Sequence, residues 1–155
     1  MLKSIGNPAT FETGQWTPTL TCSDGNFTSV TYDPLRGGSY TRIGNMVHIQ
    51  CYMRTDAVDN TVGRTGSVLI GNLPFPAASS VGGSLTGHSS LAVSVASTWG
   101  AGSFPIGAFI SGGDSNIQLL SRSLVNGATT NVLAAGVNTG ANSNVVLISG
   151  TYLAA

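Results

Sequence analysis

Charge is what this sequence has least of. Charged residues make up 8% of its 155 residues, whereas an ordinary soluble domain has about 25%. Six Lys and Arg balance six Asp and Glu, so the formal net charge is zero. A protein without net charge has little electrostatic protection against association with its own copies. The composition therefore favours a subunit of an assembly over a low-charge monomer.

The basic residues are too scattered for a polyanionic partner. Phosphate binding requires clustered Lys and Arg, and this chain spreads one Lys and five Arg between Lys3 and Arg122. Its apolar runs stop well short of the ~18 residues that cross a membrane. The first residues also lack the apolar segment of a secretory signal. These absences predict no nucleic-acid partner and no membrane partner.

Cysteine and histidine are equally scarce. Cys22 and Cys51 each lie in an alternating apolar pattern, which favours buried free thiols over a disulfide between them. Zinc takes three or four His, Cys or carboxylate ligands, often with two of them close in sequence. Neither His48 nor His88 has such a neighbour. We therefore predict no metal site and no cofactor.

Catalytic motifs are missing as well. Glycoside hydrolysis needs two carboxylates that face each other, but the five aspartates all fall in predicted turns, where Asp commonly bonds to nearby backbone amides. The sequence has neither a Gly-x-Ser-x-Gly elbow nor a Gly-rich phosphate loop with a Lys. The stretch 56–60 is more typical of a plain turn than of a calcium loop. We predict that the protein is not an enzyme. The five aspartates are Asp24, Asp33, Asp56, Asp59 and Asp114.

What the sequence does contain is a series of short β-prone runs between clusters of Asp, Asn, Gly and Pro. The clearest run, 46–54, alternates apolar and polar residues, as a half-buried antiparallel strand does. We predict an all-β fold, an antiparallel β-sandwich in the form of a jelly-roll-like knob. Further strands are expected at 16–22, 39–43, 67–70, 90–96, 106–110, 117–121 and 145–152, with a weaker one at 131–134.

The first residues differ from the rest, and we predict an N-terminal arm over 1–13 and the β-domain over 14–155. The arm spaces Leu2, Ile5 and Phe11 among polar residues, which is too little apolar surface for it to fold alone. It is either a frayed end or a segment that orders on a neighbouring molecule. In the second case Leu2, Ile5 and Phe11 are its docking residues.

Two other places are candidates for recognition. The polar face of the 46–54 run, with His48, Gln50, Tyr52 and Arg54, is a candidate contact between subunits. Trp99 lies in a Gly- and Ser-rich loop, where its ring either stacks on a sugar or anchors a partner, or folds back over the core. With Asp114 and Asn116 from a later turn, Trp99 makes up the candidate receptor-facing loops.

Four segments follow one another between residues 14 and 152: 14–20 (GQWTPTL), 40–47 (YTRIGNMV), 71–77 (GNLPFPA) and 149–152 (SGTY). In this order and spacing they resemble a β-domain of tailed-bacteriophage virion proteins, often found at the C-terminal tip of tail fibres and tailspikes. The resemblance implies a β-sandwich knob that assembles as a homotrimer in the virion, without catalysis.

The chain departs from the fibre pattern, because fibres and spikes usually have a particle-binding region and a long shaft before the tip. Here the domain begins after residues 1–13. This difference favours a capsid decoration (cement) protein that contacts the major capsid protein or other virion proteins. The alternative is a trimeric tail-fibre tip that binds a host-surface glycan.

Overall fold

The computed structural model describes residues 10–81, 85–86, 88–100, 102–123 and 127–155. Within these ranges the regular secondary structure is almost entirely strand, and no helix there is long and apolar enough to cross a membrane. The strands are β1 (Phe11–Trp16), β2 (Thr19–Cys22), β3 (Ser29–Tyr32), β4 (Gly37–Ile43), β5 (Met46–Asp59), β6 (Val68–Gly71), β7 (Ser80–Val81), β8 (Leu85–Thr86), β9 (Ser89–Ser97), β10 (Gly107–Ile110), β11 (Ile117–Arg122), β12 (Thr129–Asn131) and β13 (Ser143–Leu153), with a 3-10 turn, η1 (Ala134–Gly136), before the last strand.

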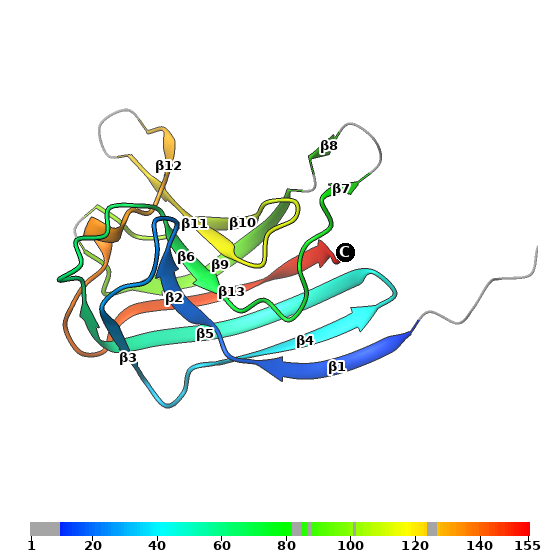
Figure 1. The fold of residues 1–155 in the computed structure, drawn as a ribbon, viewed down its shortest axis with the longest axis horizontal. Coiled ribbons are helices and arrows are strands. Elements are labelled where there is room, and N and C mark those ends of the chain that lie inside the picture. Colours follow the sequence, from blue (N-terminus) through cyan, green and yellow to red (C-terminus); the bar gives the residue numbers. More distant parts are fainter. Residues whose placement is uncertain (1–9, 82–84, 87, 101, 124–126) are drawn as a thin grey trace, which may run out of the picture.

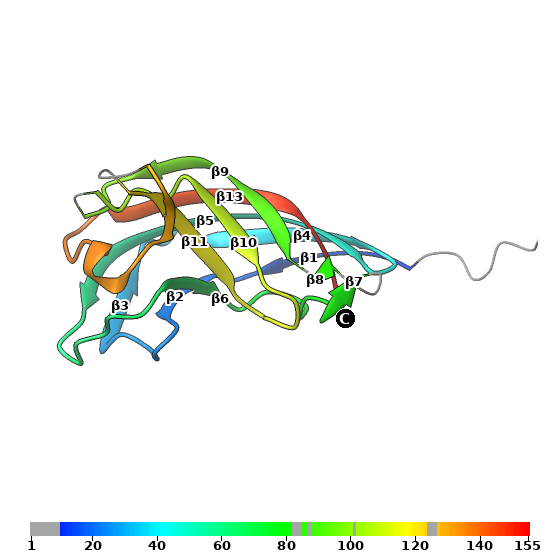
Figure 2. The same cartoon turned by 90° about the horizontal axis from the view of Figure 1, so that it is seen from above.

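One antiparallel sheet makes up the body of the molecule. Its strand order is β1-β4-β5-β13-β9-β10-β11-β6-β2, with β3 added beside β5 and β12 beside β11. The first five strands of this path form one wall, and the last four form a second wall that lies across it (Figure 1). Seen from above, the sheet curls continuously from β1 round to β2 (Figure 2). The short strands β7 and β8 pair only with each other.

This architecture confirms the predicted all-β, antiparallel fold and corrects the predicted sandwich. The two walls are halves of one curled sheet, joined where β9 pairs with β10. Irregularities in pairing accompany the curl: the register shifts between Leu147 and Ile148 against β9, and between Ser143 and Val146 against β5. Such bulges bend a strand and increase its twist, which lets a single sheet close over its own core.

The core lies between the two walls and follows the alternation of the strands. In β5 the inward residues Val47, Ile49, Cys51 and Met53 are all buried, which confirms the prediction for the 46–54 run. Ile148 of β13 packs with them from the same wall, and further apolar side chains come from the second wall. Burial of each large aliphatic side chain contributes roughly 1.5–3 kcal/mol to folding.

The predicted strand at 16–22 is wrong in one respect, because the chain divides there into two strands. β1 ends at Trp16, β2 begins at Thr19, and the two lie at opposite edges of the sheet. Pro18 lies in the break. A proline has no N–H to donate to a neighbouring strand, so a continuous ladder through this position is disfavoured.

The predicted limits of the arm and of one turn also need correction. Strand β1 begins at Phe11, so residues 11–13 belong to the sheet and pair with Ile43, Arg42 and Thr41 of β4. Strand β5 runs on to Asp59, through residues predicted as a turn, because β3 takes over from β4 as its neighbour. Asp56 and Asp59 are therefore strand residues.

Both cysteines are free and buried, as predicted. Burial raises the pKa of the Cys51 thiol to about 12 and that of Cys22 to about 11. A thiol reacts as the thiolate, so both side chains are unreactive at neutral pH and serve as small apolar core residues.

The core assignment can be tested with a matched pair of isoleucines. Ile148 in β13 is fully buried, whereas Ile106, before β10, is 54% exposed. Ile148→Ala should lower the free energy of unfolding by about 2–5 kcal/mol, because it removes buried contacts and leaves a cavity. Ile106→Ala should cost about 0.5 kcal/mol or less. Urea unfolding of both variants at one protein concentration measures the difference, and equal losses would contradict the assigned core.

Candidate functional site

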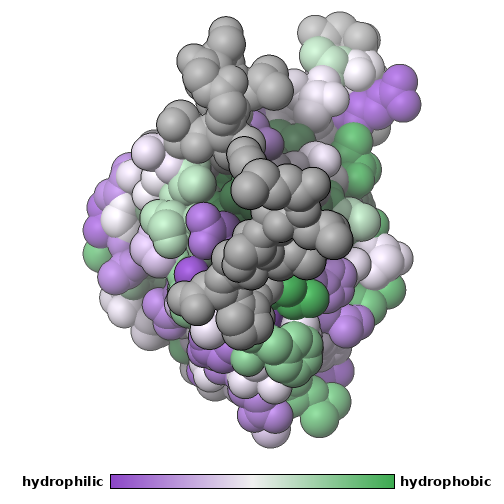
Figure 3. Space-filling view, turned by 90° about the vertical axis from the view of Figure 1, so that its right-hand side faces the viewer, coloured by the Kyte–Doolittle hydropathy of each residue, from purple (hydrophilic) through white to green (hydrophobic). Residues whose placement is uncertain are grey.

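The outward-facing side chains of β1, β4, β5 and β13 lie in straight rows, because the antiparallel registers place them directly opposite one another. We call this surface the outer face. Its first row, the apolar row, crosses all four strands at the end where β1 begins. The row consists of Phe11 (69% exposed), Ile43 (45%), Met46 (48%) and Leu153 (36%). Figure 3, which views this end, shows hydrophobic side chains at the surface among polar ones.

Two neutral polar rows follow the apolar row. The histidine row consists of Thr13, Thr41, His48 and Thr151, and the amide row of Gln15, Ser39, Gln50 and Ser149. Nδ1 of His48 lies 3.2 Å from Oγ1 of Thr151, within hydrogen-bonding distance. His48 is the single titratable side chain in these three rows. These three rows thus combine exposed hydrophobic residues with hydroxyl and amide groups and have no formal charge when His48 is neutral.

A groove of about 520 Å³ continues the outer face beyond the amide row. Its lining includes Gln15, Gln50 and Tyr52 from the sheet and the exposed Leu35 from the β3–β4 turn. Gly37 keeps the groove open, because a Cβ at this position would point into empty space. His48, Gln50 and Tyr52, predicted as a subunit contact, therefore all lie on this continuous surface.

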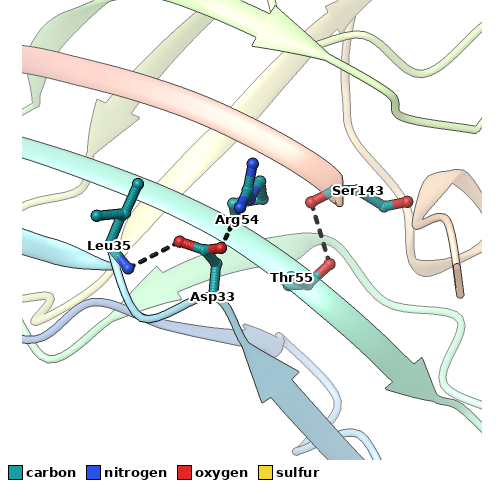
Figure 4. A network of polar contacts seen from close by, with 5 residues as sticks. All are labelled: Asp33, Leu35, Arg54, Thr55 and Ser143. Carbon is teal, nitrogen blue, oxygen red and sulfur yellow. Dashed lines mark hydrogen bonds and ion pairs between the residues drawn. The ribbon is translucent and has the colours of Figure 1, made fainter. Parts of the chain in front are cut away.

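Arg54, the fourth residue of the predicted subunit contact, has a partner within its own chain. Its guanidinium forms an ion pair with the buried carboxylate of Asp33, whose Oδ1 also accepts a hydrogen bond of 2.7 Å from the Leu35 backbone N–H (Figure 4). The hydrogen bond from Arg54, and then that from Leu35, hold the pKa of Asp33 below its ordinary value. The positive charge of Arg54 is thus largely neutralised at the end of the outer face.

A buried polar cluster lies next to this ion pair, where β5 meets the start of β13. Oγ1 of Thr55 donates to the Ser143 carbonyl at 3.2 Å, also drawn in Figure 4. The side-chain amide of Asn144 donates to Oγ1 of Thr55 at 2.8 Å and to the Asn138 carbonyl at 2.7 Å. These bonds satisfy the polar groups that the bulge in β13 would otherwise leave unpaired.

The predicted receptor-facing residues do not form one surface. Trp99 is only 4% exposed, and its indole Nε1 donates a 2.9 Å hydrogen bond to the Val145 carbonyl. The ring has folded back over the core, which is the second of the two alternatives predicted for Trp99, so it offers no accessible stacking platform. The fold-back follows a left-handed residue, Thr98, with φ of 57°.

Asp114 and Asn116 lie elsewhere. Asp114 is exposed in a turn, whereas Asn116 is half-buried and lines a second groove of about 510 Å³ at the edge of β2. Neutral amides and hydroxyls dominate its polar lining, which comes from Thr19, Thr21, Asn26, Tyr32, Asn72 and Asn116. The hydroxyl of Tyr32 also accepts a 2.7 Å hydrogen bond from the Leu20 backbone N–H, so it joins β3 to the free edge of β2.

Of the predicted docking residues, Phe11 is in β1 at the end of the apolar row, and Leu2 and Ile5 lie outside the described residues. The row itself was not predicted from the sequence, because its four members come from four strands. The alternation within 46–54 indicated which face of one strand points outward, but only the register aligns Met46 with Ile43 and Leu153.

Four of the six carboxylates, those of Glu12, Asp24, Asp33 and Asp59, engage in local hydrogen bonds. Glu12 accepts one of 2.7 Å from the Tyr40 hydroxyl, which raises the pKa of that tyrosine. Asp24 accepts one of 3.0 Å from the Thr65 backbone N–H, and Asp59 one of 2.8 Å from that of Thr61. In the part of the chain that the structure describes, no three His, Cys, Asp or Glu side chains gather into a possible metal site.

The fold defines a class of β-domain that also occurs in a phage tailspike. The crystal structure of Dettilon tailspike protein matches with a TM-score of 0.61 and 15% sequence identity, over 92% of this chain and 23% of that chain. The chain thus spans about a quarter of the tailspike that it matches. No family model matches the sequence, and no curated protein matches it.

The Asp33–Arg54 pair predicts a specific loss of stability in acid. Because folding lowers the pKa of Asp33 from 3.8, its contribution is complete above that value and is lost as the pH falls through the lower folded-state pKa. Asp33→Asn should lower the urea midpoint at pH 7. Plotted against pH, the urea midpoints of this variant and of the wild type should converge near pH 2. Asp114→Asn, at an exposed turn, should keep the acid dependence of the wild type. Parallel curves for Asp33→Asn and wild type would contradict the role of the pair.

Proposed function

We propose that this chain is a structural protein of a bacteriophage virion. The main support is the fold, which nearly the whole chain shares with part of Dettilon tailspike protein. The four sequence segments that resemble phage tail-tip domains support the same proposal independently. That resemblance rests on short sequence segments, whereas the match to the tailspike rests on the shared fold. Low charge and a neutral outer face suit a protein that works by packing against other proteins.

We propose a non-enzymatic role. The support comes from four of the six carboxylates, the groups most often used in glycan hydrolysis. Asp33 is neutralised by Arg54, Asp24 and Asp59 bind backbone amides, and Glu12 binds a tyrosine hydroxyl. A carboxylate held in such a bond stabilises local structure and is poorly placed to act as a nucleophile or acid.

We also propose that copies of the chain associate, as homotrimers. The formal net charge of zero removes long-range repulsion between copies. The outer face supplies exposed apolar area without charge, which is what a subunit contact requires. Trimers would present three copies of every loop and groove, and so would bind a repetitive surface by several weak contacts at once.

Two positions in the particle are compatible with this role. A tail position is supported by the tailspike in which the fold recurs. Capsid decoration, with contacts to the major capsid protein, is supported by the apolar residues Leu2 and Ile5 spaced along the predicted docking arm. We propose the tail position first and capsid decoration second.

Labelling of intact virions decides between them. Gold-conjugated antibody against the purified chain should label particles at the tail when viewed by electron microscopy. Label spread over the head would support capsid decoration. If neither labelling nor mass spectrometry detects the chain in purified particles, the virion proposal is contradicted altogether.

Glycan binding is a second candidate function, favoured by the groove at the edge of β2. Its amide and hydroxyl lining can donate and accept hydrogen bonds, as neutral sugars require, and the half-buried Tyr32 adds aromatic surface. Wild-type protein on a glycan array should bind neutral glycans, and Asn116→Ala should reduce that binding about tenfold by removing a directed hydrogen bond. Asp114→Ala, in the exposed turn nearby, is the control. Equal binding by all three proteins would place any glycan elsewhere, and release of reducing ends would contradict the non-enzymatic proposal.

A further inference from the structure

We propose that the outer face is the contact between copies of the chain, with the apolar row as its hydrophobic part, and that protonation of His48 weakens this contact. The inference rests on the proposed association of copies and adds to it the surface, its central residues and its regulation.

The grouping of exposed hydrophobic residues singles out this surface. Four large hydrophobic side chains, from Phe11 to Leu153, lie side by side in the apolar row. Of the exposed hydrophobics off the sheet, Leu35, Val62 and Leu133 lie in separate turns and connections, and Phe104 and Ile106 lie in the connection before β10. Isolated exposed hydrophobics are common on any protein, whereas a contiguous row marks an interaction site.

The absence of charge from the rows identifies the partner as a second copy. A partner with charged groups at its contact surface would find no opposite charge among the three rows, and would lose hydration without compensation. A second copy offers an apolar row that can pack against the apolar row of the first. Its amides and hydroxyls can form hydrogen bonds with the amides and hydroxyls of the first copy. Such groups can act as both donor and acceptor, so they can pair with the polar groups of either neighbouring copy around a threefold axis.

The size of the face agrees with this partner. Strands spaced about 4.8 Å apart and rows about 6.8 Å apart give four strands and four rows a flat footprint of roughly 500 Å². Protruding side chains raise the accessible area above this footprint, toward the ~800 Å² that each partner contributes to a standard interface. The fourth row, with Tyr52 and Leu147, lines the groove that continues the face.

His48 makes the contact sensitive to pH. It lies between Thr41 of β4 and Thr151 of β13, with Met46 and Gln50 as its neighbours along β5. The charged residues of the adjoining strands, Glu12 and Arg42, alternate onto the opposite, inner face. Protonation therefore adds a cation to each copy with no counter-charge on the outer face. Histidine is the side chain that changes charge between pH 5 and 8, so mild acid should weaken association.

The test is sedimentation velocity of the full chain over a range of concentrations. At pH 7.5 the wild type should sediment as a multiple of the 15.7 kDa chain. Met46→Lys should weaken association by about 100-fold or more, because it buries an unpaired charge in the hydrophobic part of the contact. Val62→Lys is the matched control: Val62 is exposed to a similar degree (51%) but lies in the turn after β5, so its variant should associate as the wild type does.

The second comparison concerns pH. Between pH 7.5 and 5.5 the wild type should lose affinity by about tenfold, and His48→Gln should lose none. If His48→Gln follows the wild type, the role of His48 is wrong. Circular dichroism tests whether each variant is folded. If Met46→Lys does not fold, Thr13→Lys in the neighbouring histidine row takes its place.

The outcomes separate this inference from the proposed function. An undiminished oligomer in folded Met46→Lys or Thr13→Lys would overturn the outer face as the contact and leave association of copies intact. A wild-type chain that stays monomeric would overturn both. Neither outcome bears on the place of the chain in a virion, which labelling decides independently.

Discussion

The pairing of β5 with β13 is the interaction on which the rest of the structure depends. These two long strands lie in the middle of the first wall, and their register runs from Met46 opposite Leu153 to Thr55 opposite Ser143. Their inward side chains, such as Ile49 and Ile148, form the floor of the core. Their outward side chains form the centre of the outer face. One ladder therefore positions both the core and the candidate contact surface.

The sequence predicts what is local, and the alternation in 46–54 is the clearest case. Its period of two identifies a strand, assigns Val47 and Ile49 to the core, and turns His48 and Gln50 outward, all of which the structure confirms. Most other strands were also predicted within a few residues. The choice of free thiols for Cys22 and Cys51 was correct because it followed from the same local pattern.

What the sequence does not predict depends on partners far away in the chain. The apolar row requires Phe11 to pair with Ile43 and Met46 to pair with Leu153, and no local pattern encodes those registers. The partner of Arg54 is Asp33, which looks like any other turn aspartate. Trp99 illustrates the same limit, because its flexible-looking loop hides a hydrogen bond to Val145 in a distant strand. The sandwich prediction was wrong for this reason too: strand patterns indicate walls, but only pairing shows that the walls are one sheet.

The central position of β13 has a consequence for how the chain reaches its folded form. β13 is the last strand, yet it lies between β5 and β9 and holds them in one sheet. During synthesis from the N-terminus, β5 and β9 leave the ribosome long before the strand that joins them. Loop-closure entropy opposes such distant pairings, so folding should be slow and late, with the unpaired backbone edges of β5 and β9 exposed in the meantime. A nascent chain of this design depends on residues 143–153, and premature termination before residue 143 would leave two sheet fragments with nothing between them.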